Sequence, residues 1–229
     1  MPTESLDRTP SEIRERLRLY YGTLLERLGR QRWWPARTRF EVIVGAILTQ
    51  NTSWKNVEKA IAALRRQRLL TPKALADAPL AHLEQAIRPA GYYRQKARRL
   101  KAFVSFLNQQ YGGSLRRMFR TPTPTLRRQL LEVHGIGPET ADSILLYAGN
   151  HPVFVVDAYT RRILSRHSLL DGRLRYDEIQ QWFESHLPRS APLFNEYHAL
   201  LVEVGKRWCH PRQPDCPSCP LGPYREAGR

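Results

Sequence analysis

The stretch LLEVHGIGPETADSILLYAGNHPVFVVDAYTRR, residues 130–162, contains two helix-like segments joined by a glycine-rich turn. Gly135 and Gly137 flank the apolar Ile136, and glycine allows positive φ and close approach of another backbone. The amide groups and the dipole at the start of the second helix favour phosphate. The pattern therefore predicts a helical hairpin that binds a phosphate backbone, with a purely structural hairpin as the alternative.

An aspartate, Asp157, closes the apolar run that follows the hairpin. A carboxylate at such a place is costly unless it is paired or has a chemical task. We expect Asp157 to cap the helix AYTRRILSRH with its side chain. A carboxylate there can also stabilise positive charge on a sugar, as carboxylates do in glycoside cleavage.

Helical periodicity dominates the remaining sequence. RFEVIVGAILTQ is almost entirely apolar, which predicts a central helix, with a strand as the alternative because of its β-branched residues. The next helix is expected to start at Thr52 or Ser53. The first helix is expected to be capped by Ser11. Sustained two-residue alternation flanked by hairpin turns is absent from the sequence, so the predicted fold class is all-α.

The charge of the chain points to a polyanionic partner. The 229 residues carry a net charge of +16, which favours nucleic acid first and an acidic membrane second. A solvated basic surface is the alternative. The longest apolar run, residues 42–48, is far shorter than the roughly 20 residues that span a bilayer, and the N-terminus lacks the regions of a signal peptide. We expect a cytoplasmic, nucleoid-associated protein.

All three cysteines, Cys209, Cys216 and Cys219, lie in the segment CHPRQPDCPSC. With no cysteine elsewhere to pair with them, this spacing favours a metal or cluster over a disulfide framework.

Four ordered segments across roughly residues 31–219 resemble one family. VHGIGPETADSILLYAGNHPVFVVDAYTRR is similar to the helix–hairpin–helix and Gly/Pro…Asp signature of the endonuclease III superfamily of DNA glycosylases. The segments FEVIVGAILTQNTSWKNVEKAI, IRPAGYYRQKARRLK and CHPRQPDCPSC resemble its early helix pair, a following segment and its C-terminal cluster loop.

The resemblance implies an all-α, two-domain helix–hairpin–helix DNA glycosylase fold with a DNA cleft between the domains. The expected domains are residues 31–148, a six-helix barrel-like unit ending in the hairpin, and residues 1–30 plus 149–229 with the cysteine loop. The implied partner is double-stranded DNA containing a damaged base, which is flipped out and removed, and the implied state is a monomer. Asp157 matches the catalytic aspartate. The implied DNA-binding residues are Gln50, His134, Gly135, Ile136, Gly137 and Thr140.

Glu139 decides which chemistry the resemblance allows. Bifunctional members of the superfamily have a lysine at this position that forms a Schiff base and cleaves the strand. A carboxylate cannot form an imine, and the sequence has no lysine between Lys101 and Lys206. The expected activity is therefore base removal without strand cleavage, with Glu139 contacting base or water; a favourable first-turn helix charge is the structural alternative.

The branch that this chain resembles most closely in its motifs is the endonuclease III-like 3-methyladenine DNA glycosylases. RWWPARTRF, GYYRQKARRL and Glu139 carry this likeness. Alkylated purines are cationic leaving groups, so aromatic stacking and cation–π contact suit them. The implied base pocket contains Trp33, Trp34, Trp54 and Lys206; core packing for the tryptophans and phosphate contact for the lysine are the alternatives.

Two positions leave alternatives open. Gln50 matches a position that fills the gap left by the flipped nucleotide, or it caps a helix. The cysteine spacing resembles a 4Fe-4S loop, yet the fourth cysteine would fall at position 225, which is Arg225. A cluster held by three cysteines and His210, a carboxylate or an external ligand, a labile cluster, and a loop without a cluster all remain possible, and we expect His210 to be exposed.

The competing functions are an endonuclease III-like glycosylase for oxidised pyrimidines or mismatched bases, and a non-catalytic damaged-DNA-binding protein. Gln50 and the cysteine loop favour the first alternative, whereas Glu139 and the pair Trp33–Trp34 oppose its lyase step. The charge and the hairpin are sufficient for the second, whereas Asp157 argues against it.

Overall fold

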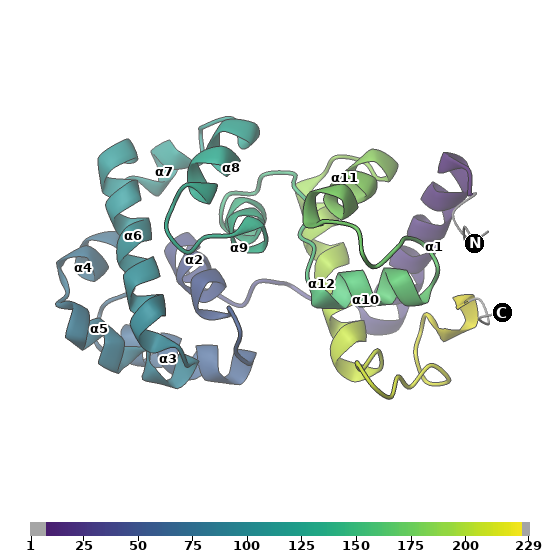
Figure 1. Cartoon of the computed structure of the whole chain (residues 1–229), viewed down its shortest axis with the longest axis horizontal. Coiled ribbons are helices and arrows are strands. Elements are labelled where there is room, and N and C mark those ends of the chain that lie inside the picture. Colours follow the sequence, from purple (N-terminus) through teal and green to yellow (C-terminus); the bar gives the residue numbers. More distant parts are fainter. Residues whose placement is uncertain (1–7, 226–229) are drawn as a thin grey trace. The chain divides into compact units, whose positions relative to one another are not determined.

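A computed structural model describes residues 8–225 of the chain, and these residues form helices and connecting segments without a strand (Figure 1). The all-α prediction is thereby confirmed. The chain divides into two units, one comprising Met1–Trp33 with Pro152–Arg229 and the other Trp34–His151. The sequence placed these divisions at residues 31 and 148, and the outermost residues of its domain prediction, 1–7 and 226–229, lie outside the described part.

The second unit is built around one apolar helix. Every residue of α2 from Phe40 to Leu48 is buried, and α2 contacts α3, α6, α9 and η3 (Figure 1). This confirms that the apolar segment is a central helix. The helices of this unit are α2 (Arg39–Leu48), α3 (Trp54–Arg66), α4 (Pro72–Asp77), α5 (Leu80–Ala86), η2 (Arg88–Ala90), α6 (Tyr93–Tyr111), α7 (Leu115–Met118), α8 (Thr123–Leu131), α9 (Pro138–Ser143) and η3 (Ile144–Ala148).

A lysine is buried in the same unit. Lys96 on α6 is 1% exposed, and its Nζ donates a hydrogen bond to the Ala90 carbonyl at 2.8 Å. Burial, assisted by the nearby Arg99, lowers the pKa of Lys96 to about 8. The Lys96 side chain thus joins α6 to η2 through the Ala90 carbonyl.

The first unit consists of α1 (Pro10–Leu28), α10 (Ala158–Arg166), α11 (Tyr176–His186), α12 (Ala191–Arg207) and the short η4 (Gly222–Tyr224). Helix α12 packs against α1 and α10. The expected cap of α1 at Ser11 is wrong, because Thr9 is the N-cap and forms a capping box with Glu12. Pro10 takes the first helical position, where its missing N–H costs little.

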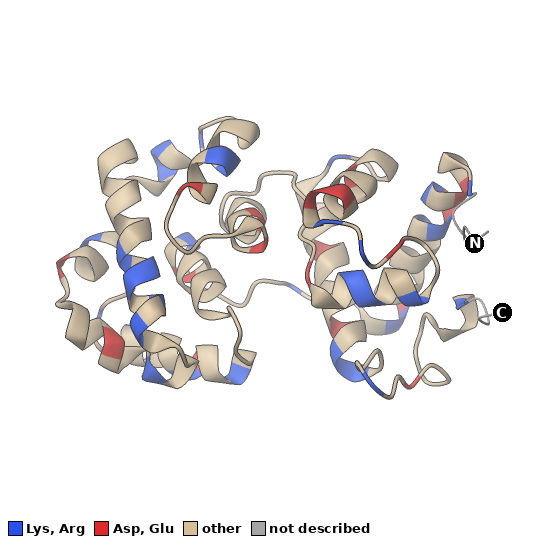
Figure 2. Ribbon diagram, viewed as in Figure 1, with Lys and Arg blue, Asp and Glu red and all other residues tan. Residues whose placement is uncertain are grey.

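Positive side chains occur on helices of both units (Figure 2). Helix α6 contains five lysines and arginines and no acidic residue, and α10 contains three arginines and no acidic residue: Arg94, Lys96, Arg98, Arg99, Lys101, Arg161, Arg162 and Arg166. Among the described residues, no helix is long and apolar enough to cross a membrane.

Candidate active site and DNA-binding elements

The hairpin connects α8 to α9 through residues 132–137. Gly135 has φ +81°, and a Cβ at this position would lie 2.3 Å from Cγ of Arg99. Gly137 is extended, with φ −94° and ψ 179°, and a Cβ there would meet nothing within 4 Å. Of the two glycines, Gly135 adopts the positive φ that glycine allows and is required by conformation and packing, whereas Gly137 leaves the start of α9 open.

The Gln50 side chain joins α2 to the hairpin. Its Nε2 donates to the Gly135 carbonyl at 3.1 Å and to Thr140 Oγ1 at 2.9 Å. Its Oε1 accepts a hydrogen bond from Arg99. The amide is thus engaged on both sides, and Arg99 is a member of this cluster that the sequence reasoning missed.

The remaining hairpin residues differ in exposure. His134 and Gly137 are exposed and lie at the turn, whereas Ile136 is buried and anchors it. Thr140 is buried, so its hydroxyl serves Gln50 rather than solvent. Glu139 is exposed in the first turn of α9. The charge of Glu139 is favourable at that end of the helix.

Asp157 caps α10 as the sequence predicts. Its Oδ1 accepts a hydrogen bond from the Thr160 amide at 2.7 Å, and its side chain is 12% exposed. The second oxygen, Oδ2, lies 3.6 Å from Nε2 of His198 on α12. One oxygen is therefore fixed by the backbone, and the other faces an imidazole.

His198 is a residue that the sequence reasoning missed. It is buried at 5% exposure, and burial lowers the pKa of its imidazole, while the Asp157 charge acts in the opposite direction. Its sequence signal is a single histidine within the apolar segment YHALLVEV. Such a histidine is also found in ordinary cores, so only the fold reveals that it faces Asp157.

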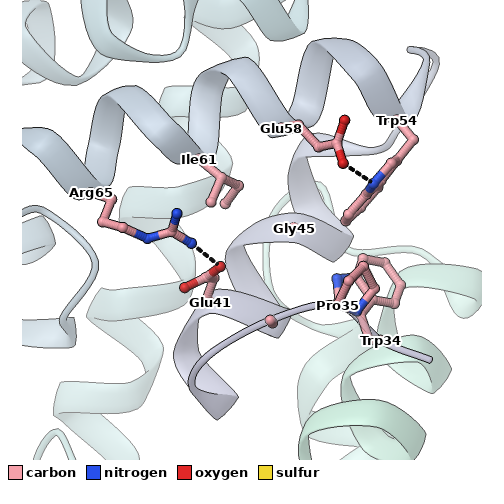
Figure 3. A pocket seen from close by; sticks show the side chains of 9 residues that line it. Trp34, Pro35, Glu41, Gly45, Trp54, Glu58, Ile61 and Arg65 are labelled. Atoms are coloured by element: carbon pink, nitrogen blue, oxygen red, sulfur yellow. Dashed lines mark hydrogen bonds and ion pairs between the residues drawn. The ribbon is translucent and has the colours of Figure 1, made fainter. Parts of the chain in front are cut away.

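Two of the predicted pocket tryptophans contact each other in the second unit. The ring centroids of Trp34 and Trp54 are 5.3 Å apart with an interplanar angle of 83°, and the ring centroid of Tyr147 lies 5.2 Å from that of Trp34. Figure 3 shows both indoles at a pocket of about 260 Å³. A Cβ at Gly45 would lie 3.2 Å from the Trp34 ring, so glycine there allows the indole to pack against α2.

The other wall of this pocket is charged. Glu58 accepts a hydrogen bond from Nε1 of Trp54 at 2.9 Å, one helical turn away on α3 (Figure 3). Farther along, Arg65 binds the buried carboxylate of Glu41 at 2.6 Å (Figure 3). The pocket therefore combines aromatic surfaces with the Glu58 carboxylate and the Glu41–Arg65 ion pair.

Trp33 and Lys206 form a second pair in the first unit. The ammonium of Lys206 lies 5.2 Å from the centre of the Trp33 ring, within cation–π range. Lys206 also binds Glu203 at 3.1 Å. The four predicted pocket residues thus form two pairs, one in each unit.

Arginines hold the cysteine loop. Arg166 on α10 donates to Sγ of Cys209 at 3.2 Å and to the His210 carbonyl at 2.6 Å. Arg225, at the position where a fourth cysteine was expected, donates to Sγ of Cys216 at 3.3 Å. His210 is exposed, as expected from the sequence.

The third thiol, Cys219, is buried. Burial raises the pKa of this thiol, backbone hydrogen bonds at Leu221 and Gly222 lower it, and the charges of Cys209 and Cys216 raise it further. Within residues 8–225, no group of three His, Cys, Asp or Glu side chains is arranged to hold a metal ion. Three thiols, two of them bonded to guanidinium groups, do not make the four-thiolate set of a 4Fe-4S centre.

Comparison with known proteins identifies the family of the chain. The model described as HhH-GPD superfamily base excision DNA repair protein matches residues 44–189. The chain therefore belongs to the HhH-GPD superfamily of base excision DNA repair proteins.

Individual similar proteins indicate which kind of base excision repair protein this chain is. A Methanocaldococcus jannaschii protein provisionally named a DNA repair glycosylase is 48% identical over 203 residues, covering 88% of this chain and 91% of that protein. Thermotoga maritima endonuclease III is 31% identical over 180 residues, 79% of each chain. The crystal structure of H. pylori 3-methyladenine DNA glycosylase bound to 1,N6-ethenoadenine matches with a TM-score of 0.75 and 30% identity, covering 85% of this chain and 97% of that one. The protein is accordingly an endonuclease III-like DNA glycosylase.

Proposed function

We propose that this glycosylase is monofunctional: it hydrolyses the N-glycosidic bond of a damaged base in double-stranded DNA and leaves the strand intact. The observation that carries this proposal is Glu139 in the first turn of α9, where the lyase reaction requires an amine. The chain offers no lysine between Lys101 and Lys206.

The proposed mechanism uses the two elements described above. The open turn at Gly137 and the amides that begin α9 bind a phosphate and fix the register of the strand. Asp157 stabilises the positive charge that develops on the sugar as the base departs, and water then adds to the sugar. The exposed Glu139 contacts the base or that water.

The proposed substrates are alkylated purines such as 3-methyladenine. The aromatic pair Trp34 and Trp54, with the carboxylate of Glu58 on the indole N–H, provides electron-rich surfaces for a cationic base. Trp33 is a further stacking surface, and Lys206 lies against it. The H. pylori relative, a 3-methyladenine DNA glycosylase, supports this substrate class.

A panel of labelled duplexes tests the substrate. We expect release of 3-methyladenine in single-turnover reactions, and no release of thymine glycol or of mismatched thymine or adenine. Release of thymine glycol alone would replace the alkylpurine proposal. Binding to all duplexes with no release from any would contradict the glycosylase activity itself.

Borohydride trapping on abasic DNA tests the monofunctional assignment. The wild-type protein is expected to give no covalent adduct, because residue 139 supplies no amine. The matched variant Glu139→Lys supplies one, so an adduct with this variant alone would locate the missing chemistry at position 139. A trapped adduct with the wild type would refute the assignment.

The second candidate is an endonuclease III-like activity on oxidised pyrimidines or mismatches. The 31% identity to Thermotoga maritima endonuclease III and the presence of Gln50 favour it. In this case Gln50 would have to release Gly135 and Thr140 to enter a DNA helix. The duplex panel distinguishes the two candidates.

For the cofactor we propose a structural role only. A cluster at this loop would be bound by Cys209, Cys216 and Cys219, together with a ligand other than residue 225. Iron analysis and visible charge-transfer absorption test for such a cluster. If neither iron nor this absorption is found, the contacts of Arg166 and Arg225 alone support the loop. We also propose that the protein is a monomer and that it is associated with the nucleoid.

A further inference from the structure

The buried imidazole of His198 faces the carboxylate on which the proposed chemistry depends. Nε2 of His198 is 3.6 Å from Oδ2 of Asp157, and both side chains are largely shielded from solvent, at 7% and 12% exposure. On the other side of the carboxyl group, the Thr160 amide donates to Oδ1 at 2.7 Å. The carboxyl group thus lies between a backbone donor and an imidazole nitrogen.

Packing alone does not explain a histidine at this position. His198 lies on α12 in the run HALLV, and its ring meets the edge of Phe154 at 6.3 Å. An apolar side chain would fill the same space without the cost of burying an imidazole beside a carboxylate. The capping bond from Thr160 is formed by Asp157 without help from α12.

The charge state of the imidazole follows from its surroundings. Burial lowers the pKa of His198, the Asp157 carboxylate raises it, and burial has the larger effect. The other charged groups of α10 and α12 are bonded elsewhere: Glu196 to the Gln31 amide, Arg161 to the carbonyls of residues 172 and 174, Arg162 and Arg166 to the carbonyls of Cys209 and His210, and Glu203 to Lys206 and Arg207. A neutral imidazole provides a donor to Asp157 without cancelling its negative charge.

We propose that His198 is a positioning residue for Asp157: its Nε2–H donates to Oδ2 while the Thr160 amide donates to Oδ1, which gives the carboxyl group a single orientation toward the sugar. Hydrogen bonds between catalytic groups are often long in the free enzyme and shorten in the complex. The 3.6 Å separation between Nε2 of His198 and Oδ2 of Asp157 has to shorten in this way for the hydrogen bond to form. The inference rests on the proposed role of Asp157. It gives a role in the reaction to a residue of α12 that does not contact the substrate.

Two variants of His198 test the role. His198→Leu keeps the packing and removes the donor, whereas His198→Gln keeps an N–H donor that does not ionise. We expect the single-turnover excision rate of His198→Leu to fall roughly 10- to 100-fold, because a small misplacement of a reacting group has effects of that size. His198→Gln is expected to recover most of this loss, and affinity for abasic-site DNA is expected to stay within about twofold in both.

His167→Gln is the matched control, because His167 is also a buried histidine of the same unit, bonded to Tyr20 at 2.7 Å. Its substitution is expected to lower thermal stability and leave the excision rate unchanged. The pH profile gives a readout that packing does not affect. The acid limb of the wild-type rate is expected to contain the ionisation of His198, and His198→Gln removes that ionisation, so its limb moves to lower pH.

A double-mutant cycle separates this inference from the proposed function. In the Asp157→Asn background, His198→Leu should have no further effect on the rate, since the group that it orients is gone. Wild-type rates in His198→Leu, or an equal effect in the Asn background, would overturn the positioning role. If the wild type releases no base, the proposed function fails, and the same cycle measured by urea unfolding still decides: additive shifts would overturn the contact.

Discussion

At Asp157, one carboxylate oxygen accepts a hydrogen bond from the Thr160 amide and the other faces His198, so the helix cap and the proposed catalytic group are the same side chain. The substitution Asp157→Asn separates the two roles, because asparagine caps a helix as well as aspartate does. We expect its unfolding midpoint to change little. Its single-turnover excision rate should fall by about 100-fold or more, because the negative charge is lost.

A surface carboxylate of the same unit provides the control for that substitution. Asp171 binds Arg173 at 2.7 Å in the segment between α10 and α11. Asp171→Asn is expected to excise at the wild-type rate. A wild-type rate in Asp157→Asn would remove Asp157 from the mechanism, whereas a large loss of stability in that variant would show that the cap depends on charge.

At the scale of the hairpin, the two glycines predict different outcomes for the same change. Gly135→Ala introduces a methyl group at positive φ and against Arg99, so we expect a loss of unfolding free energy of about 1–3 kcal/mol. Gly137→Ala adds a methyl group in open space and should change stability by less than about 0.5 kcal/mol. Urea unfolding measures both.

Gly137→Ala should lower DNA affinity although it leaves stability almost unchanged. The added methyl group of Gly137→Ala projects into the approach to α9, so the affinity for duplex DNA should fall several-fold while the fold is intact. Unchanged affinity in Gly137→Ala would contradict phosphate binding at this turn. Gly135→Ala is the control: its duplex affinity, measured at a temperature at which it is still folded, shows how much of a loss of affinity comes from reduced stability alone.

The sequence predicts elements whose signals are local. The apolar run of α2, the start of α3 after Ser53 and the cap at Asp157 all follow from patterns within a few residues, and the structure confirms each one. The sequence predicts the cap of α1 at Ser11, but it lies at Thr9, because two polar residues separated only by Pro10 give similar capping signals.

Other features depend on residues far apart in the chain. The π-helical turn η3 continues α9 without any sequence signal of its own. Arg99 reaches Gln50 across 49 positions, and His198 reaches Asp157 across 41. Hydrophobic periodicity contains no information on such pairs, because each of these side chains is compatible with its own local segment whether or not the distant partner is present.

For the whole molecule, buried histidines make stability depend on pH. Burial lowers the pKa of His151, with a hydrogen bond to the Phe119 backbone opposing it. The folded-state pKa is below the unfolded one, so the unfolded chain binds a proton that the folded chain does not once pH falls below about 6.5. Stability should therefore be retained above that pH and decrease as pH falls toward the folded-state pKa.

Urea unfolding at pH 7 and pH 5 measures this acid sensitivity. His151→Gln is expected to reduce the difference between the two pH values, because it removes the group that must protonate. His82, an exposed histidine on α5, is the control, and His82→Gln should leave the difference unchanged. An equal effect of both substitutions would show that burial of His151 is not the cause.

The net charge predicts how binding responds to salt. With +16 on the chain, duplex affinity should fall linearly on a logarithmic plot against salt, by roughly a thousandfold or more between 50 and 200 mM if six or more phosphates are contacted. The unfolding midpoint over the same range serves as the control. An affinity that is independent of salt would contradict a phosphate-based interaction.

The buried amine of Lys96 offers a chemical reporter of how the second unit opens. An acylating reagent cannot reach an Nζ that is 1% exposed and bonded to a carbonyl, whereas Lys55 and Lys59 on α3 are exposed and react directly. The rate of labelling at Lys96, relative to those two lysines, therefore measures how often α6 and η2 separate. Footprinting with and without DNA would show whether the bound strand slows that separation.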